Sequence, residues 1–507
     1  MPIKPLVKHI ILYSLVHMGL LLSTGIFWDD WSIINVSEET LKDQFINNGV
    51  LLGYYFHYPF WLLKSPWLYH AMTFIMYGVA YVFIGKILQS NIFNWKPSNA
   101  WAMVYLLDVL PFNESKITAI CSFYTVCFFL FILGFYLFHC RQEIRFKITG
   151  IILLLGGFLT PSIPFYYITV LMAMTIINGY DKDFLTWLKN AFSLGVKKYG
   201  IPIFLAGIYF IVYRANTQPN QVSQAGYNEI SHDHIGEIPM NMVKTTYINA
   251  IEFYQQVPKV LTNKLGIFVF LLFTIGLLVF KNSINMTKKQ TTVVMATGLF
   301  LWLTAMIPYL AIGKLPTFYE HLCRHHLLTP IGFSLVIIGA LSLFGPKIQS
   351  MVYIVVMAFF GTITFGQYLS YQAEQIKMTW LQTELATMKA IDTSYTMIIK
   401  DNANSFKSNE NPNRYYSWAG LLHSISGKQN KFMGNKEELE YVNSYPEKYC
   451  LSEFNMKDYK PKISPDLELT IEEVPITQFV VLKSWIYFGN NAELSKIGNE
   501  YLNINYD

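Results

Sequence analysis

Two adjacent carboxylates flanked by indole rings are the strongest candidate for chemistry, in Trp28-Asp29-Asp30-Trp31. Adjacent like charges raise the pKa of at least one member, which helps a carboxylate to act as a general base near neutral pH. A metal ligand is a second role. The structural alternative is that Trp marks a membrane interface whose outer side tolerates acids. We expect Asp29 or Asp30 to be catalytic, with Trp28 and Trp31 lining the substrate cleft.

Asp108 and Glu114 form a second acidic group. Asp108 interrupts an apolar run, where a charge is costly unless it faces a wet cavity or has a partner. Its structural alternative is a helix-packing hydrogen bond to a Ser or Tyr. Glu114 lies near the outer surface within residues 111–115 (PFNES), and its alternative is a solvated loop charge. We expect Glu114 to be a second catalytic acid and Asp108 to line the cleft.

Basic side chains gather where an outer loop meets an apolar segment, at His321, Arg324, His325 and His326. An Arg guanidinium binds phosphate as a planar fork, and His adds donors. Snorkelling to an interface explains one long basic side chain, but not two neighbouring His as well. Zinc is a weaker alternative, since no cysteine or carboxylate pattern completes a recognised site. We expect Arg324, His325 and His326 to hold a phosphate at the membrane surface.

Two further residues could line the cleft. His57 precedes a Tyr-Pro pair, and the structural alternative for this segment is a turn before an interfacial helix. Arg214 could pair with acids or with phosphate. The sequence has no Walker A loop, no GxGxxG after an expected strand and no GxSxG elbow. ATP-driven and hydrolase functions therefore lose support. We predict no metal site and commit to no cofactor, while a divalent cation stays open.

The composition indicates a polytopic membrane protein. Of 507 residues, 53% are hydrophobic and only 14% are charged, against about 25% charged in an average soluble chain. The net charge of +5 is weak evidence for nucleic acid, because a small basic excess in membrane proteins reflects cytoplasmic loops. The five cysteines show no CxxC spacing. We expect the lipid bilayer as a partner and no nucleic acid.

The apolar runs predict an all-α bundle of about eleven transmembrane helices, since a span needs about 20 apolar residues. Residues 99–111 and 148–160 are short enough to be half-helices, and 50–63 is interpreted as an interfacial or re-entrant piece. The expected spans are residues 9–27, 67–85, 99–111, 118–139, 148–160, 164–178, 199–213, 265–280, 291–312, 325–344 and 349–369.

Lys and Arg residues are concentrated in loops on the side of the N-terminus, which predicts a cytoplasmic N-terminus and an uncleaved signal-anchor as first span. An odd number of spans puts the tail outside. We expect a membrane domain over 1–369, with outer loops at 28–66 and 214–264, and an extracytoplasmic α/β domain over 370–507. Helical spacing in 371–391 and strand-like runs at 395–399, 468–474 and 478–488 predict its elements.

This layout resembles that of the GT-C superfamily of polytopic membrane glycosyltransferases, and is similar to that of bacterial O-antigen glucosyltransferases. The resemblance covers 1–369 and rests on a first span leading directly into Asp29-Asp30, a long first outer loop, many spans and an outer C-terminal domain. Its specific motifs are few: the Asp pair, residues 57–59, residues 111–115 and residues 324–326. The resemblance does not extend to the tail, which lacks a WWDYG-like segment, and this argues against an oligosaccharyltransferase.

The resemblance implies a hexosyltransferase that moves a sugar from a polyprenyl-phosphate-linked donor to an extracytoplasmic glycan acceptor, such as O-antigen of lipopolysaccharide, with inversion. One first-loop Asp would deprotonate the acceptor hydroxyl. Arg324, with His325 or His326, would stabilise the departing lipid phosphate. The implied location is the bacterial inner membrane, with the C-terminal domain in the periplasm. Which Asp acts, and whether Glu114 is the second acid, stays open.

Two alternatives to this function remain. An outer-face polysaccharide polymerase or ligase also has many spans, but such enzymes favour Arg-rich outer loops, and the segment 214–264 holds one Arg. A lipid-linked glycan transporter or flippase would have charges at mid-depth, broken helices in paired positions and repeated halves. Asp108 is the only acid of this kind in an expected span, and the sequence contains no visible repeat.

Overall fold

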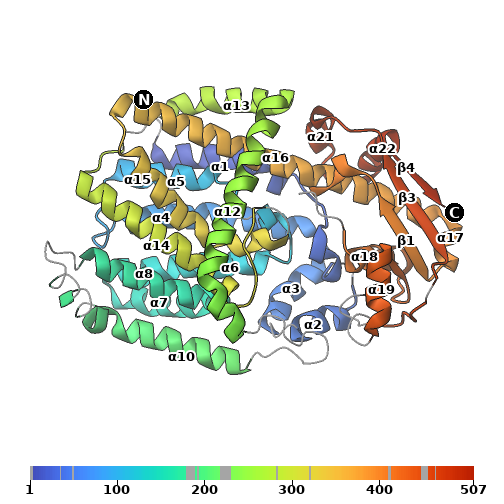
Figure 1. The fold of residues 1–507 in the computed structure, drawn as a ribbon, viewed down its shortest axis with the longest axis horizontal. Coiled ribbons are helices and arrows are strands. Elements are labelled where there is room, and N and C mark those ends of the chain that lie inside the picture. The colour runs from blue at the N-terminus through green and yellow to red at the C-terminus, as the bar shows by residue number, and fades with distance from the viewer. Residues whose placement is uncertain are drawn as a thin grey trace.

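The structure is a computed structural model of the full chain. It describes all residues except 1–3, 35, 48–50, 113, 179–185, 187–188, 191–192, 194, 217–229, 281–283, 319–320, 409–412, 447–454, 463 and 507. Figure 1 shows a helical bundle on the left and a smaller domain with a β-sheet on the right. The two parts are joined by one long helix, α16 (Pro346–Thr387), of 42 residues.

The bundle helices begin where proline allows it and pack closely where glycine allows it. Proline stands in the first turn of several of them, where its missing N–H costs nothing. A Cβ at Gly332 would lie 2.3 Å from the backbone nitrogen of Trp302, so two helices meet through small residues. The helices are α1 (Pro5–Leu21), α4 (Pro66–Gln89), α5 (Pro97–Val109), α6 (Ser122–Phe135), α7 (Ile144–Gly157), α8 (Ser162–Asn178), α10 (Gly200–Asn216), α13 (Lys264–Leu277), α14 (Lys288–Leu310), α15 (Thr329–Leu341) and α16, with π or 3-10 turns η3 (Tyr136–Cys140), η4 (Gly195–Tyr199) and η5 (Leu278–Phe280) extending α6, α10 and α13.

Four helices among the described residues are long and apolar enough to cross a membrane: α4, α6 with η3, α14 and α16. The number becomes five if the helix pair with a 95° bend before α13 is one broken span. The expectation of about eleven spans is therefore wrong. Helices α5 and α15 have 13 residues each, about 20 Å of length against a hydrocarbon core of about 30 Å. Apolar runs predicted the helices, but a run cannot tell a span from a shorter buried helix.

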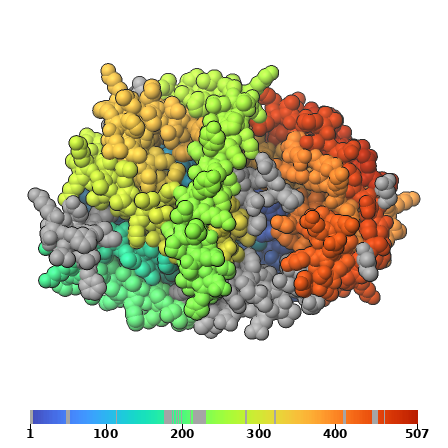
Figure 2. Space-filling model, in the orientation of Figure 1, coloured from blue at the N-terminus to red at the C-terminus, as the bar shows by residue number. Residues whose placement is uncertain are grey.

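Both expected outer loops contain helices. The first holds α2 (Glu38–Asn47) and α3 (Leu51–Leu63), and α3 covers the piece interpreted as interfacial. The second is largely one helix, α12 (His232–Thr262), of 31 residues. Figures 1 and 2 show α12 running across the face of the bundle, and the chain bends by 95° between α12 and α13. Its outer side exposes Met240, Val243, Tyr247 and Tyr254.

The C-terminal domain has a four-stranded sheet in the order β2-β1-β3-β4. Strand β1 (Thr396–Asp401) is parallel to β2 (Phe432–Gly434) and β3 (Leu467–Glu473), and β3 is antiparallel to β4 (Leu502–Tyr506). Helices α17 (Lys389–Thr393), α18 (Tyr415–Ser426), α19 (Lys436–Ser444), α21 (Gln478–Ser484) and α22 (Asn491–Tyr501) accompany it. The strands expected at 395–399 and 468–474 are confirmed. The strand expected at 478–488 is wrong, because that run forms α21 and a 3-10 turn whose Trp485 packs on Phe365 of α16.

Helix α18 docks on the turn that follows α1. This turn is the 3-10 helix η1 (Trp28–Ser32), which carries both candidate acids. Gly420 permits the contact, because a Cβ there would lie 2.5 Å from the backbone oxygen of Trp31. The hydroxyl of Ser417 also donates to the backbone oxygen of Trp28 at 3.2 Å. The C-terminal domain is thus in direct contact with the acidic motif.

Replacing Gly420 by Val should separate α18 from η1. The added side chain meets backbone rather than a flexible side chain, so we expect a loss of about 1–3 kcal/mol, visible as a lower midpoint of thermal unfolding in detergent and faster proteolysis of the C-terminal domain. Gly236→Val is the control, since nothing lies within 4 Å of a Cβ at Gly236. Equal stability of the two variants would contradict this account of the contact.

Candidate active site

Asp30 is a structural anchor. Its side chain is fully buried and accepts three backbone N–H groups: from Ala119 at 2.9 Å, from Ile120 at 2.9 Å and from Phe27 at 3.3 Å. Burial raises the pKa of Asp30 to about 7, and these three N–H groups act in the opposite direction. Asp30 therefore fastens the exit from α1 to the loop before α6, and a substrate could not reach it without unfolding this joint.

Asp29 is the accessible member of the pair. Its carboxylate is 24% exposed, and its Oδ2 accepts from Nη1 of Arg324 at 3.0 Å. Arg324 itself is 19% exposed and comes from η6 (His321–His326), 295 residues away in sequence. Tyr416 of α18 also hydrogen-bonds to Asp29 through its hydroxyl, and this buried hydroxyl has a pKa raised well above its usual value. A carboxylate, a guanidinium and a phenol thus meet at one half-open position.

The backbone before Asp29 is strained. Trp28 has φ of +48°, in the left-handed region that costs energy for any residue with a side chain. Two contacts from the C-terminal domain hold it: its Nε1 donates to Oγ of Ser408 at 3.2 Å, and its backbone oxygen accepts from Ser417. Strain of this kind persists only where the surroundings enforce it, and it is commonest at functional sites.

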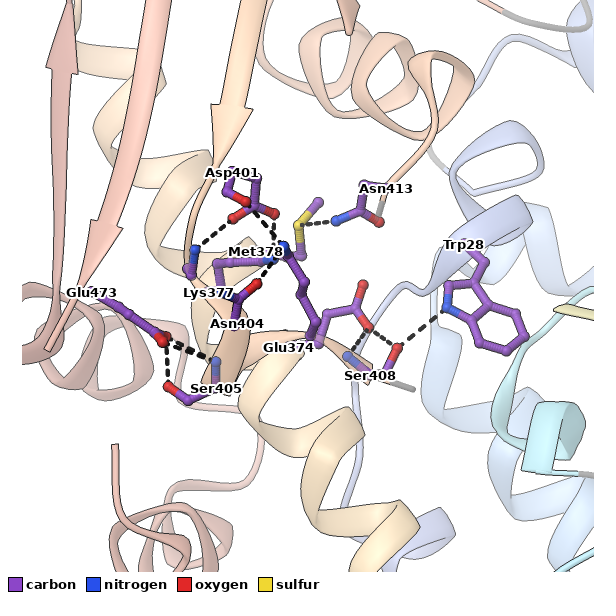
Figure 3. A network of polar contacts seen from close by, with 12 residues as sticks. Trp28, Glu374, Lys377, Met378, Asp401, Asn404, Ser405, Ser408, Asn413 and Glu473 are labelled. Atoms are coloured by element: carbon purple, nitrogen blue, oxygen red, sulfur yellow. Dashed lines mark hydrogen bonds and ion pairs between the residues drawn. The ribbon is translucent and has the colours of Figure 1, made fainter. Parts of the chain in front are cut away.

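A buried polar network holds the indole ring of Trp28 in place. Figure 3 shows the connection from Trp28 through Ser408 to Glu374 of α16, which accepts from both the backbone N–H and the hydroxyl of Ser408. One turn further along α16, the ammonium of Lys377 pairs with Asp401 of β1 at 2.9 Å. The position of the Trp28 ring, and with it the start of η1, therefore depends on α16 and on the sheet.

Glu114 lies in the 3-10 turn η2 (Glu114–Ile117) and is buried rather than solvated. Its charge acts on Lys116, which is also buried: burial lowers the pKa of Lys116 to about 7, while Glu114 favours its protonated form. Glu114 also acts electrostatically on Cys323, the residue before Arg324. Glu114, the second acid, is therefore buried and lies close to η6, the turn that carries Arg324.

His325 and His326 of the basic cluster face the protein interior. His326 is fully buried, its Nδ1 lies 2.9 Å from Oγ1 of Thr329, and its ring packs against Phe112. Burial lowers the pKa of His326 to about 3, so this ring is neutral at physiological pH. His325 is buried as well, with its ring 4.6 Å from that of Tyr309. Arg324 is accordingly the member of this cluster that places a positive charge beside Asp29.

The remaining residues expected in the cleft make their contacts with residues other than Asp29. His57 is buried, stacks on Phe45 and shares a hydrogen bond with Tyr69, and burial lowers its pKa to about 3. Asp108 is buried and pairs with His9 of α1 at 2.9 Å, so its helix-packing partner is a His and not a Ser or Tyr. Trp31 is buried under Gly420. Arg214 belongs to α10, and its side chain lies outside the described part of the chain.

In the part of the chain that the structure describes, no group of three or more His, Cys, Asp or Glu side chains is arranged to hold a metal ion. The acidic motif contributes one accessible carboxylate, since both carboxylate oxygens of Asp30 already accept hydrogen bonds from backbone N–H groups. The chemistry that these residues can support is therefore that of a single carboxylate base beside a guanidinium.

Sequence reasoning missed Tyr416, Ser408 and Glu374. The sequence contains 34 Tyr, so no local signal distinguishes Tyr416 from the others. Glu374 falls in the stretch interpreted as a tail helix, where an acid reads as an ordinary solvated charge. Only the docking of the C-terminal domain on η1 brings these residues to the acidic motif.

No family model, curated protein or solved structure matches the chain in the comparisons.

Asp29 and Asp30 should respond differently to the same change. Asp30→Asn turns an amide N–H toward a backbone N–H in a buried site, which we expect to cost about 1–3 kcal/mol. Asp29→Asn breaks a partly exposed ion pair, worth about 0–1 kcal/mol. Thermal unfolding of the two purified variants checks this. A larger loss for Asp29→Asn would contradict the assignment of Asp30 as the anchor.

Proposed function

We propose that this chain is a membrane glycosyltransferase of the GT-C type, which moves a sugar from a polyprenyl-phosphate-linked donor to an extracytoplasmic glycan acceptor. The observation that carries the proposal is the partly exposed contact of Asp29 with Arg324, at 3.0 Å. It supplies a base and a cation for an anionic leaving group within one site. The burial of Asp30 and the neutrality of His326 leave Asp29 and Arg324 as the reacting pair.

In the proposed reaction Asp29 accepts the proton of an acceptor hydroxyl, and that oxygen attacks the anomeric carbon of the donor sugar. The bond from this carbon to the phosphate oxygen breaks, and the new glycosidic bond forms on the opposite face, so the configuration inverts. The electron pair of the broken bond stays on the lipid phosphate, where Arg324 stabilises it. Tyr416 orients Asp29 and is a positioning residue.

The ion pair also suggests how the donor would prepare the site. A phosphate is a better bidentate partner for a guanidinium than one carboxylate oxygen. On donor binding, Arg324 would turn to the phosphate, and Asp29 would be released to accept a proton. The resting contact would thereby keep the base inactive until the donor is present.

The orientation that this function needs is part of the proposal. The N-terminus would lie in the cytoplasm, the C-terminal domain in the periplasm, and the chain in a bacterial inner membrane, with a surface polysaccharide such as O-antigen as acceptor. Helices that could cross a membrane support membrane association. The acidic motif lies at the end of α1 opposite the N-terminus, beside the C-terminal domain, which agrees with an outward-facing site.

One observation favours the transporter alternative. The pair His9–Asp108 is buried inside the bundle, at 3% and 0% exposure, and buried ionisable groups in membrane proteins often mark transport pathways. The same pair has a structural explanation, because it joins α1 to α5 and His9 also bonds to the backbone oxygen of Gly78 in α4. A transfer assay separates the two functions.

Sugar transfer in isolated membranes, with labelled polyprenyl-phosphate sugars and a supplied polysaccharide acceptor, tests the function. We expect Asp29→Asn to lower the rate by about 10²-fold to 10⁴-fold and Arg324→Ala by about 10²-fold to 10³-fold, at matched expression. Glu39→Gln and Arg145→Ala are the controls, since both side chains are exposed, at 67% and 75%. Unchanged transfer by Asp29→Asn would refute the mechanism, and no transfer by wild type with any donor would refute the function.

Tyr416→Phe tests the contribution of the C-terminal domain. Loss of the hydroxyl leaves Asp29 in contact with Arg324 but removes its second tether, so we expect kcat to fall about tenfold with little change in KM for the donor. Tyr445→Phe is the matched control, because Tyr445 is 51% exposed. If kcat of Tyr416→Phe equals that of the control, Tyr416 does not position the base.

A further inference from the structure

A cavity of about 760 Å³ opens inside the bundle, away from the acidic motif. Its walls are apolar side chains from several helices, among them Ile87 of α4, Met103 of α5, Phe131 of α6, Leu301 of α14 and Leu335 of α15. The volume lies within the range of about 300–1,000 Å³ that is usual for ligand sites. Such a lining selects an apolar body and disfavours a polar metabolite.

Positive charge collects at the mouth of this cavity. The α4–α5 connection contributes Lys96, and the first turn of α14 contributes Lys289, both with exposed side chains. The start of α14 adds the partial positive charge of a 23-residue helix. Neutral polar groups from Asn94 and Gln290 complete the rim. The cavity is therefore apolar inside and cationic at one end.

The two sides of the mouth are held in place by reciprocal amide bonds. Asn99 of α5 donates to the backbone oxygen of Asn285 at 3.1 Å and accepts from its N–H at 3.0 Å. Gln349 of α16 does the same with Ile284, at 2.9 Å and 3.0 Å. These four bonds fix the segment before α14 against α5 and α16. The mouth is consequently preformed, which lowers the cost of binding.

This cavity is distinct from the Asp29 site. Lys8, in the first turns of α1, donates to the backbone oxygen of Val279, and it lies over the ring of Phe280, five residues before Asn285 at the cavity mouth. Asp29 follows the opposite end of α1. Since α1 has 17 residues, the mouth of the cavity is separated from Asp29 by about 25 Å at 1.5 Å per residue.

We propose that the cavity binds one acidic phospholipid, with acyl chain inside and phosphate between Lys96 and Lys289. An amphiphile is the class of ligand that matches an apolar interior with a charged rim. The two ammonium groups and the helix start select an anionic headgroup over a zwitterionic one. The bilayer beside the candidate spans supplies such lipids. The proposal does not depend on the glycosyltransferase function, because it concerns other residues and its test measures no transfer.

Native mass spectrometry of the detergent-purified full chain tests the proposal, with phosphatidylglycerol and phosphatidylcholine of identical acyl chains as probes. We expect wild type to retain one phosphatidylglycerol in preference to phosphatidylcholine. Lys96→Gln combined with Lys289→Gln should reduce this preference roughly 30-fold, because each lysine contributes about 1 kcal/mol to binding an anionic lipid. Lys288→Gln is the matched control, because Lys288 precedes Lys289 in the same helix turn and does not line the cavity.

Val294→Phe fills the cavity from its wall and should abolish retention of the lipid while leaving both lysines in place. The proposal would be overturned by equal retention of the two lipids by wild type, by an equal effect of Lys288→Gln and Lys289→Gln, or by undiminished retention in a folded Val294→Phe variant. Complete displacement of the lipid by millimolar inorganic phosphate would also overturn it, because the site would then be a phosphate site and not a lipid site.

Discussion

The buried carboxylate of Asp30 is the interaction on which the site depends. A carboxylate without water must receive hydrogen bonds from the protein, and here three backbone N–H groups supply them, one from nearby Phe27 and two from the distant Ala119 and Ile120. This requirement fixes the turn after α1 against the segment 119–120. The segment lies just after η2, which is in contact with η6 and therefore with the backbone that carries Arg324. Asp29 meets Arg324 because Asp30 is held in place beside it.

The C-terminal domain supplies the side of the candidate site that the bundle does not form. Helix α16 leaves the bundle and enters this domain without a break, and the buried pair Lys377–Asp401 joins it to the first strand. That continuity brings α18 over η1, where Tyr416 reaches Asp29 and Ser417 holds the strained Trp28. The C-terminal domain is therefore one wall of the candidate site.

The sequence predicted what depends on short stretches of chain. Apolar runs predicted most bundle helices, and runs rich in Val, Ile, Tyr and Phe predicted β1 and β3. The number of spans was not predictable, because a 13-residue apolar helix such as α15 and a full span share one composition. The run from Phe479 to Leu482 has strand-like residues, yet packing on α16 makes it helical. The burial of Asp30, in contrast to the partly exposed Asp29, was equally hidden, since it depends on N–H groups about 90 residues away.

The ion pairs Lys377–Asp401 and Arg324–Asp29 differ in the free energy that is lost when they are broken, and this difference separates their roles. Lys377–Asp401 is 1% and 9% exposed, and breaking such a buried pair costs about 3–5 kcal/mol, so it can only hold structure. Arg324–Asp29 is 19% and 24% exposed, and a pair in contact with water contributes about 0–1 kcal/mol. In the proposed mechanism a donor phosphate replaces the carboxylate of Asp29, and this exchange gives up a weak contact for a bidentate one. The proposed base therefore has a contact that is close enough to hold the resting geometry and weak enough for the donor to break.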